Sequence, residues 1–183
     1  ILPGGVVTAK DTAEIELDAN GEFVRNPGVD LVKVAVVERH QGTGNVACGF
    51  LKGYGIKEGA VALSVAHDSH NIIVVGVNDE EMEFAVNSLI EQEGGIVLVK
   101  EGKVIESMPM PIAGLMSDQS GEWVDQKLTD IHEKAYEELG ICGDVEPVMT
   151  LCFMSLAVIP EIKLTDMGLF DVTTFSFIPV EVE

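Results

Sequence analysis

Basic residues are scarce in this sequence of 183 residues. It holds 11 lysines and arginines against 31 aspartates and glutamates, a formal net charge of -20 at pH 7. The basic residues stand singly among carboxylates, so no basic cluster is available to attract a phosphate backbone or an anionic lipid surface. We therefore expect that the chain binds neither nucleic acid nor membranes, and that its acidity serves solubility.

Cysteines are few, and apolar runs of membrane-spanning length are missing. Cys48, Cys142 and Cys152 are odd in number and widely spaced, so we expect reduced, buried thiols in a cytoplasmic protein. The longest apolar stretch, 148–159, is shorter than the roughly 20 residues that cross a bilayer. The N-terminus lacks both an export signal and an initiator methionine. We expect a piece of a longer protein.

The hydrophobic pattern predicts an α+β fold with mixed β-sheet layers and two main amphipathic helices. Residues 31–37, 60–66 and 72–77 are rich in apolar and β-branched residues and are bounded by turn residues, which is typical of buried strands. Residues 96–108 predict a hairpin whose first strand lies inside the sheet. A last strand is expected near 172–178.

Two segments have the 3.6-residue apolar period of amphipathic helices. The first begins at Asn78, with Glu81 in the capping-box position and an apolar face that includes Ile90, and it ends at Gly94-Gly95. The second covers about 120–139 and ends at Gly140.

The chain divides into two unequal parts. Residues 1–28 are rich in turn residues, with one alternating stretch at 13–17, and we interpret them as a linker or edge-strand segment arriving from an absent N-terminal region. Residues 29–183 form the domain.

A polar corner interrupts two predicted strands and is the strongest candidate site. It consists of His67, Asp68, Ser69, His70 and Asn71. Such groups are costly to desolvate, and histidine changes charge near neutral pH. A tight turn would bring His70 back beside His67. Three interpretations stay open: a structural turn that satisfies its own backbone, a lid or substrate contact, and a weak partial metal site formed by His67 and His70.

A second candidate is Arg39-His40, which leads from a predicted strand into the glycine-bearing loop 42–45. A ligand could approach such a loop closely. The loop is not the dinucleotide-binding pattern G-x-G-x-x-G. The structural alternative is that Arg39 pairs with a carboxylate and the glycines only turn the backbone.

Five separated motifs follow one another in the chain: Val36–His40 with Gly42–Asn45, Ser64–Gly76, Gly94–Val97, Pro109–Ser117 and Leu164–Asp171. Together they resemble the C-terminal domain of bacterial adenine deaminase, and the resemblance spans nearly the whole chain. It implies a parent enzyme of the metal-dependent amidohydrolases, which converts adenine and water to hypoxanthine and ammonia. The implied cofactor is a divalent metal, Mn, Fe or Zn, which would activate the attacking water.

The chain lacks the catalytic barrel that this resemblance implies. A (β/α)₈ barrel alone needs about 250 residues, so none of the barrel's metal ligands can be carried over. The H-x-E and P-C-x-x-C signature of the cytidine-type deaminases is also absent. We therefore assign no catalytic residue here and no bound metal that this chain must hold by itself.

We expect this chain to follow the N-terminal catalytic barrel of the same protein and to complete or cover its active site. Adenine would be the substrate of the parent, which we expect to be a homo-oligomer. The alternatives are a non-catalytic structural or oligomerisation module and a stand-alone metal-binding domain.

Overall fold

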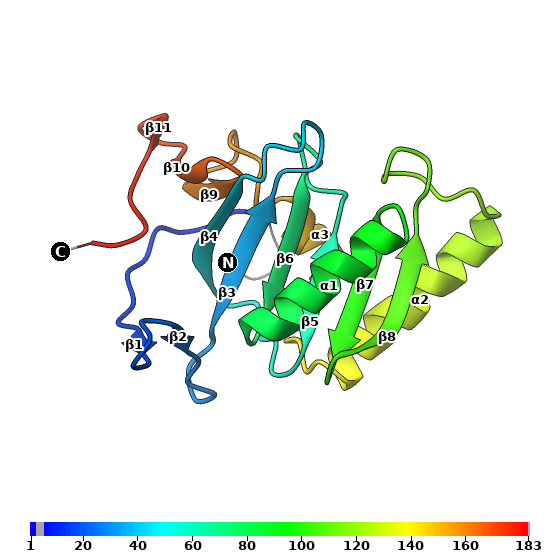
Figure 1. The fold of residues 1–183 in the computed structure, drawn as a ribbon, viewed down its shortest axis with the longest axis horizontal. Helices are drawn as coiled ribbons and strands as arrows, with labels where there is room; N and C mark the ends of the chain where they lie inside the picture. The colour runs from blue at the N-terminus through cyan, green and yellow to red at the C-terminus, as the bar shows by residue number, and fades with distance from the viewer. Residues whose placement is uncertain (3–5, 183) are drawn as a thin grey trace.

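A six-stranded antiparallel sheet is the centre of the fold (Figure 1). The computed structural model describes residues 1–2 and 6–182. The strands of this sheet are β3 (Leu31–Val37), β4 (Val46–Lys52), β5 (Ala60–Leu63), β6 (Ile72–Gly76), β7 (Gly95–Lys100) and β8 (Lys103–Pro109). They lie in the order β4-β3-β6-β5-β7-β8, and each neighbouring pair is antiparallel.

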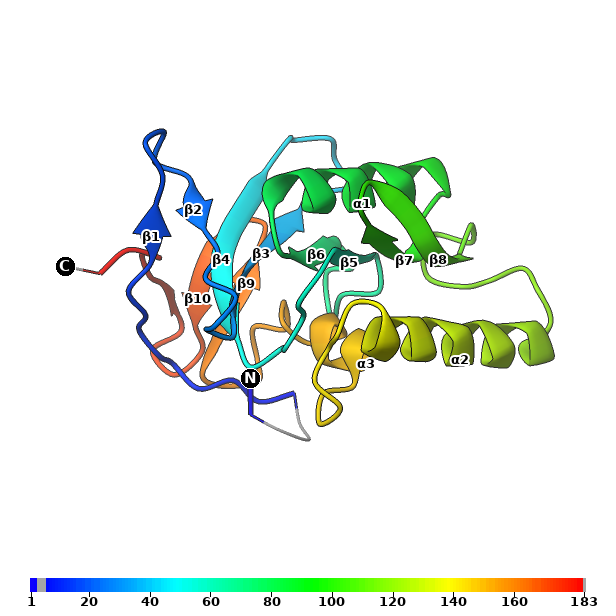
Figure 2. The same cartoon turned by 90° about the horizontal axis from the view of Figure 1, so that it is seen from below.

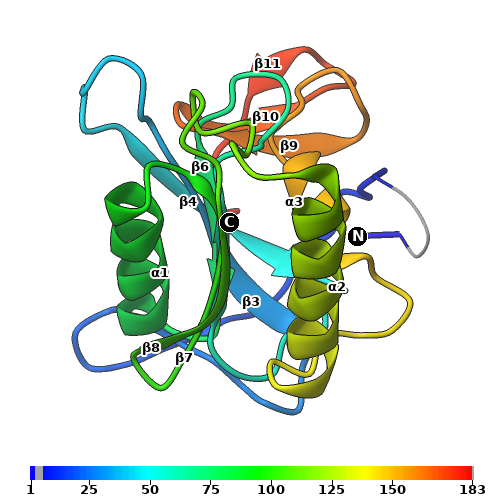
Figure 3. The same cartoon turned by 90° about the vertical axis from the view of Figure 1, so that its right-hand side faces the viewer.

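Helices cover both faces of the sheet. The helix α1 (Asp79–Glu91) lies on one face, whereas α2 (Gly121–Glu137) and α3 (Pro147–Cys152) lie on the other (Figure 2 and Figure 3). The core under α1 is built largely from alanine and valine, and the core under α2 and α3 from larger leucine, isoleucine and methionine side chains. The predicted α+β class with two main amphipathic helices is confirmed.

The sheet strands are apolar on both faces because helices pack on both of them. Strands β5 and β6 are buried throughout, and β7 is buried from Gly95 to Val99 between β5 and β8. The predicted hairpin with an inner first strand is therefore confirmed.

The N-caps of both long helices are the residues at which these helices were predicted to begin. The side chain of Asn78 accepts a hydrogen bond from the Glu81 N–H at 2.8 Å, and Ser120 accepts one from the Trp123 N–H at 3.3 Å. Glu81 does not complete the capping box, because its carboxylate accepts from the Gly102 N–H in the β7–β8 turn. The predicted apolar face of α1 is wrong at Ile90, which is 56% exposed.

A second, three-stranded sheet was only partly predicted. Its order is β11-β10-β9, with bounds β9 (Ile162–Thr165), β10 (Gly168–Asp171) and β11 (Ser176–Phe177). Of the strand expected at 172–178, only β11 forms. The Asp171 carboxylate accepts hydrogen bonds from the backbone N–H groups of residues 173 and 174, and these hold a turn before β11. Strand β4 was not predicted either. It is an edge strand that includes Gly49 and has an exposed face, so its apolar pattern is weak.

The N-terminal segment carries a small hairpin. Strand β1 (Glu16–Leu17) pairs with β2 (Phe23–Val24), so the alternating stretch at 13–17 is a strand only at its end. Residues 3–5 of the predicted linker segment lie outside the described residues. The boundary between 28 and 29 stays a prediction.

The cysteines are free thiols, as expected, but the expectation that all are buried is wrong. Cys152 is buried in α3, whereas Cys48 and Cys142 are exposed. None of the helices in the described part of the chain is long and apolar enough to cross a membrane.

Candidate functional site

The predicted site residues lie on loops at one end of the six-stranded sheet. Antiparallel pairing places the end of β3, the β5–β6 connection and the end of β8 at the same edge. We call this edge, with loops 38–45, 64–71 and 109–117, the loop end. It is the upper end of the sheet in Figure 1.

The polar corner is a tight turn that brings its two histidines together, as predicted. The His70 N–H donates to the Ala66 carbonyl at 2.6 Å, and the His67 N–H donates to the Cys152 carbonyl at 2.8 Å. The imidazole rings meet edge to face with centroids 5.4 Å apart, and the His67 ring also lies 4.8 Å from that of Phe153. The corner is therefore held both by its own turn and by α3.

His70 has the most perturbed environment in the corner. Its Nδ1 atom is buried and has no hydrogen-bond partner among the described residues. Burial, followed by the positive charges of His67 and Arg39, lowers the pKa of His70 below its ordinary value of 6.5. Its imidazole is therefore neutral at neutral pH and offers one donor and one acceptor nitrogen.

Arg39 links the corner to a loop that is distant in the sequence. Its Nε donates to the His70 carbonyl at 2.5 Å, and its Nη2 donates to the Ala113 carbonyl at 2.9 Å. The Arg39 backbone N–H donates to the side chain of buried Asn71 at 3.3 Å. The alternative that Arg39 pairs with a carboxylate is wrong within the described residues, because its side chain binds carbonyl oxygens.

Ser64 and Gly114 complete this arrangement, and the sequence analysis did not identify them as site residues. The Ser64 hydroxyl donates to the Gly114 carbonyl at 2.6 Å and accepts from the Gly95 N–H at 2.8 Å. Gly114 has a φ of +72°, and a Cβ there would stand 2.9 Å from Nη1 of Arg39, so this position favours glycine. One signal in the sequence could have pointed to Ser64 and Gly114. It is the neighbouring pair Gly94-Gly95, which was interpreted only as the end of a helix.

His40 joins the same group of loops. Its Nε2 atom lies 2.7 Å from the Ser69 carbonyl oxygen. The Glu38 carboxylate holds the loop, accepting backbone hydrogen bonds from Thr43, Gln41 and His40, and these lower the pKa of Glu38 to about 2. The 38–45 loop is therefore built around a carboxylate that stays ionised.

The structure thus gathers six of the seven predicted site residues through direct contacts: His67, His70, Asn71, Arg39, His40 and, through its carbonyl, Ser69. Asp68 is exposed and makes no hydrogen bond or ion pair among the described residues. Within residues 1–2 and 6–182, no group of three or more histidine, cysteine, aspartate or glutamate side chains could hold a metal ion. Metal ligation by His67 and His70 stays a prediction, and the described residues add no third such ligand to this pair.

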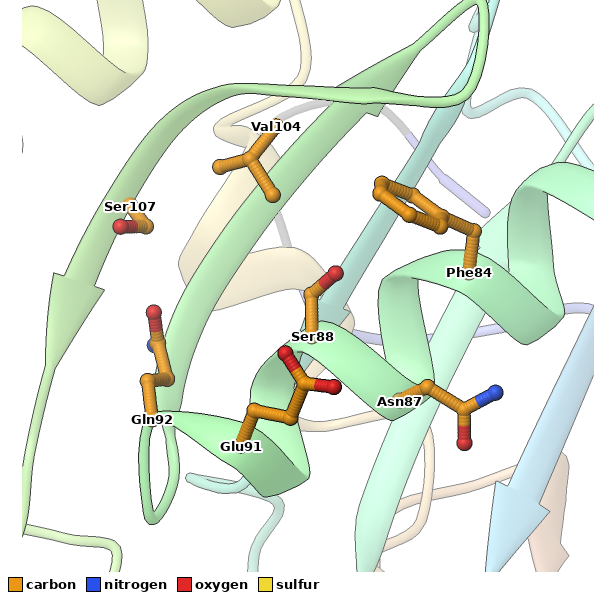
Figure 4. Close-up of a pocket in the computed structure, with 7 residues that line it drawn as sticks. All are labelled: Phe84, Asn87, Ser88, Glu91, Gln92, Val104 and Ser107. Atoms are coloured by element: carbon orange, nitrogen blue, oxygen red, sulfur yellow. The ribbon is translucent and has the colours of Figure 1, made fainter.

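A separate groove of about 440 Å³ lies between α1 and β8 (Figure 4). Its lining shares no residue with the loop end and consists of Phe84, Asn87, Ser88, Glu91, Gln92, Val104 and Ser107. The Gln92 amide donates to the backbone carbonyls of Gly94 and Ile96, so its hydrogen bonds hold the start of strand β7. The groove does not contribute to the candidate site.

Comparison with known proteins agrees with the motifs that meet at the loop end. The family model for the adenine deaminase C-terminal domain matches residues 5–176. The chain belongs to this family. The resemblance to this family that the five sequence motifs indicated is confirmed.

Relatives of this adenine deaminase C-terminal domain carry the same enzyme name. The chain is 71% identical over 181 residues to "Adenine deaminase 2" of Desulfotalea psychrophila, covering 99% of this chain and 31% of that protein. It is 49% identical over 183 residues to "Adenine deaminase" of Ligilactobacillus salivarius, covering 100% of this chain and 32% of that protein. The chain therefore spans about a third of the length of these curated relatives.

Proposed function

We propose that this domain belongs to an enzyme that hydrolyses adenine to hypoxanthine and ammonia, and that its loop end covers the active site of a catalytic barrel in the same polypeptide. The names of the relatives support the reaction. Their greater length supports a further, N-terminal domain as partner. The single observation that carries the assignment of the loop end is the meeting of Arg39, His40, His67 and His70 from two separate loops.

The chemistry of this edge suits a lid over a small heteroaromatic ring. A neutral imidazole can donate one hydrogen bond and accept another, and a purine edge presents both acceptors and donors. Arg39 uses its donors on carbonyls of the loops, so it acts as a positioning residue. His67 and His70, with exposed Asp68 and Ser69 beside them, are the proposed contacts to substrate.

The remaining features of the parent enzyme belong to the same proposal. Its divalent metal, Mn, Fe or Zn, would be held by the barrel and would supply the activated water of an amidohydrolase. The free thiols and the acidic surface suit a cytoplasmic enzyme. We also propose a homo-oligomeric assembly.

Substitution of the corner histidines in the full-length protein tests this proposal. We expect His70→Ala and His67→Ala to lower adenine turnover by about tenfold or more, the range of lost substrate positioning, with little change in melting temperature. His132→Ala, a histidine on α2 outside the loop end, is the control and should retain turnover. Equal losses of turnover and stability, or full activity in both corner variants, would refute the role of the corner.

Assays of the 183-residue chain alone separate the alternatives. We expect no release of ammonia from adenine, because the proposed barrel is missing. Turnover by this chain would overturn the proposal. A stoichiometric divalent metal in elemental analysis would favour a stand-alone metal-binding domain instead.

A further inference from the structure

The three-stranded sheet carries the two most exposed large apolar side chains among the described residues. Met167, in the β9–β10 turn, is 71% exposed, and Phe175, just before β11, is 75% exposed. Figure 1 and Figure 3 show this sheet at the same end of the molecule as the loop end. Met167 lies at one end of β10, and Phe175 and the exposed Phe177 pack on Phe170 near its other end, so exposed apolar groups run along this sheet. Exposed apolar groups that gather on one element mark interaction surfaces.

These side chains stand on a rigid support. The rings of Phe175 and Phe177 each meet the ring of buried Phe170 edge to face, with centroids 5.2 Å apart. The buried Asp171 carboxylate accepts from the Thr173 N–H and hydroxyl at 2.9 and 2.6 Å, which fixes the turn before β11. An anchor held in place before binding loses little entropy on association.

The backbone of Phe175 is also strained. Its φ of +54° lies in the left-handed region, which is uncommon for a bulky residue. The residue lies in the turn between β10 and β11, and its ring is largely exposed. Strained residues are found where a surrounding structure or a partner makes use of them.

The N-terminal segment reaches the domain beside this same sheet. The Thr8 N–H donates to the Pro160 carbonyl at 3.2 Å, and the Glu161 N–H donates to the Thr8 carbonyl at 2.7 Å. Lys163 of β9 donates to the Val6 carbonyl at 2.7 Å, and Lys10 pairs with Asp171 at 3.2 Å. Residues 6–10 are therefore fastened along the start of β9.

We propose that the sheet β9–β11 is the surface on which this domain docks with the upstream part of its own polypeptide, with Met167 and Phe175 as apolar anchors. The curated relatives are about three times as long as this chain, and the family is defined as a C-terminal domain. The upstream part would be joined to the chain ahead of residues 6–10, which lie along β9, and this would give it a high effective concentration near the sheet. The inference rests on the proposed function only in requiring that upstream part.

Methionine oxidation in the full-length protein tests the docking surface without any activity assay. We expect peroxide to oxidise Met167 at least about tenfold more slowly in the folded protein than in urea, as for a side chain exposed only by local opening. Met149 of α3, which is 59% exposed in this domain, is the reference for access of the reagent. Oxidation of Met167 at its rate in urea would overturn the proposal.

Two further arms identify the partner. Phe175→Asn keeps a residue that tolerates the left-handed conformation and should raise Met167 oxidation towards its rate in urea, whereas Ile90→Asn on α1 should leave it unchanged. Protection that persists on dilution to the monomer supports docking within one polypeptide. Protection lost when an oligomer dissociates would assign the surface to a second copy and overturn the proposal. Protection of Met167 without adenine turnover would refute only the proposed function.

Discussion

The interior of the six-stranded sheet and the loop end are held together by different forces. In the interior, apolar strands are buried between helices, and both core clusters consist of apolar side chains. At the loop end, side chains of Arg39 and Ser64 bind backbone carbonyls from other loops. The difference indicates that the interior supplies stability and the loop end supplies a fixed polar surface.

The adjoining three-stranded sheet extends this comparison. It buries a lysine and exposes a methionine and a phenylalanine, the reverse of the pattern in the six-stranded sheet. Buried charges cost free energy, and exposed apolar patches favour association. This end of the molecule therefore gives up some stability of its own, as expected of a surface that is completed by a partner.

The largest expected effect comes from a cavity in the interior. Leu98 is fully buried on the α2 side of the sheet, so Leu98→Ala should lower the free energy of unfolding by about 3 kcal/mol. Urea denaturation of the 183-residue chain measures this. Ile90→Ala, at an exposed position on α1, should change the free energy of unfolding by less than about 0.5 kcal/mol. Similar losses at both positions would contradict the division between interior and surface.

The second prediction concerns the buried lysine of the small sheet. Lys163 is 1% exposed, and burial lowers its pKa from 10.5 to about 8. At pH 7 both the folded and the unfolded chain carry the proton, so burial of the charge costs up to about 3 kcal/mol. Lys163→Met removes that cost and loses one hydrogen bond worth about 1 kcal/mol, so it should stabilise the chain by about 2 kcal/mol.

The pH dependence of this effect has a defined sign. Between pH 8 and 10.5 the unfolded chain binds the proton of Lys163 and the folded chain does not, so wild-type stability rises with pH relative to Lys163→Met. The advantage of the variant should therefore be lost towards pH 10.5. Urea denaturation from pH 7 to pH 10 measures it. A difference that does not vary with pH would exclude the titration of Lys163 as its cause.

The third prediction addresses the link between two loops at the loop end. Arg39→Ala removes the donors to the carbonyls of His70 and Ala113, and it should lower the free energy of unfolding by about 1.5 kcal/mol. Hydrogen exchange should show faster exchange in loops 64–71 and 109–117 and unchanged exchange in β5 and β7. Arg39→Lys can keep one of the two contacts and should have a smaller effect. Unchanged exchange in the loops would show that Arg39 does not hold them.

The smallest expected effect on stability comes from the titration of His70. Its folded pKa lies below the ordinary value of 6.5, so the unfolded chain binds more protons as the pH falls below that value. Wild-type stability should therefore decrease more steeply below pH 6.5 than that of His70→Gln. NMR titration of the imidazole measures the pKa directly. A value at or above 6.5 would contradict the buried, neutral state.

Much of the fold could be predicted because its signals are local. The strands at 31–37 and 72–77 and the two long helices follow from apolar periodicity and from the caps Asn78 and Ser120, which act over three residues. Strand β4 was missed and the small sheet was only partly predicted, because their side chains are partly exposed. Their pairing depends on distant partners rather than on their own pattern.

The sequence by itself determined the α+β class, the family, and the polar composition of the corner, because these depend on residue identity and short spacing. Only the tertiary structure decided that Arg39 binds the carbonyls of His70 and Ala113 and that Ser64 holds Gly114. Those contacts join residues 31 to 74 positions apart in the chain. The antiparallel register of the whole sheet brings them to one edge, and no local pattern encodes that register.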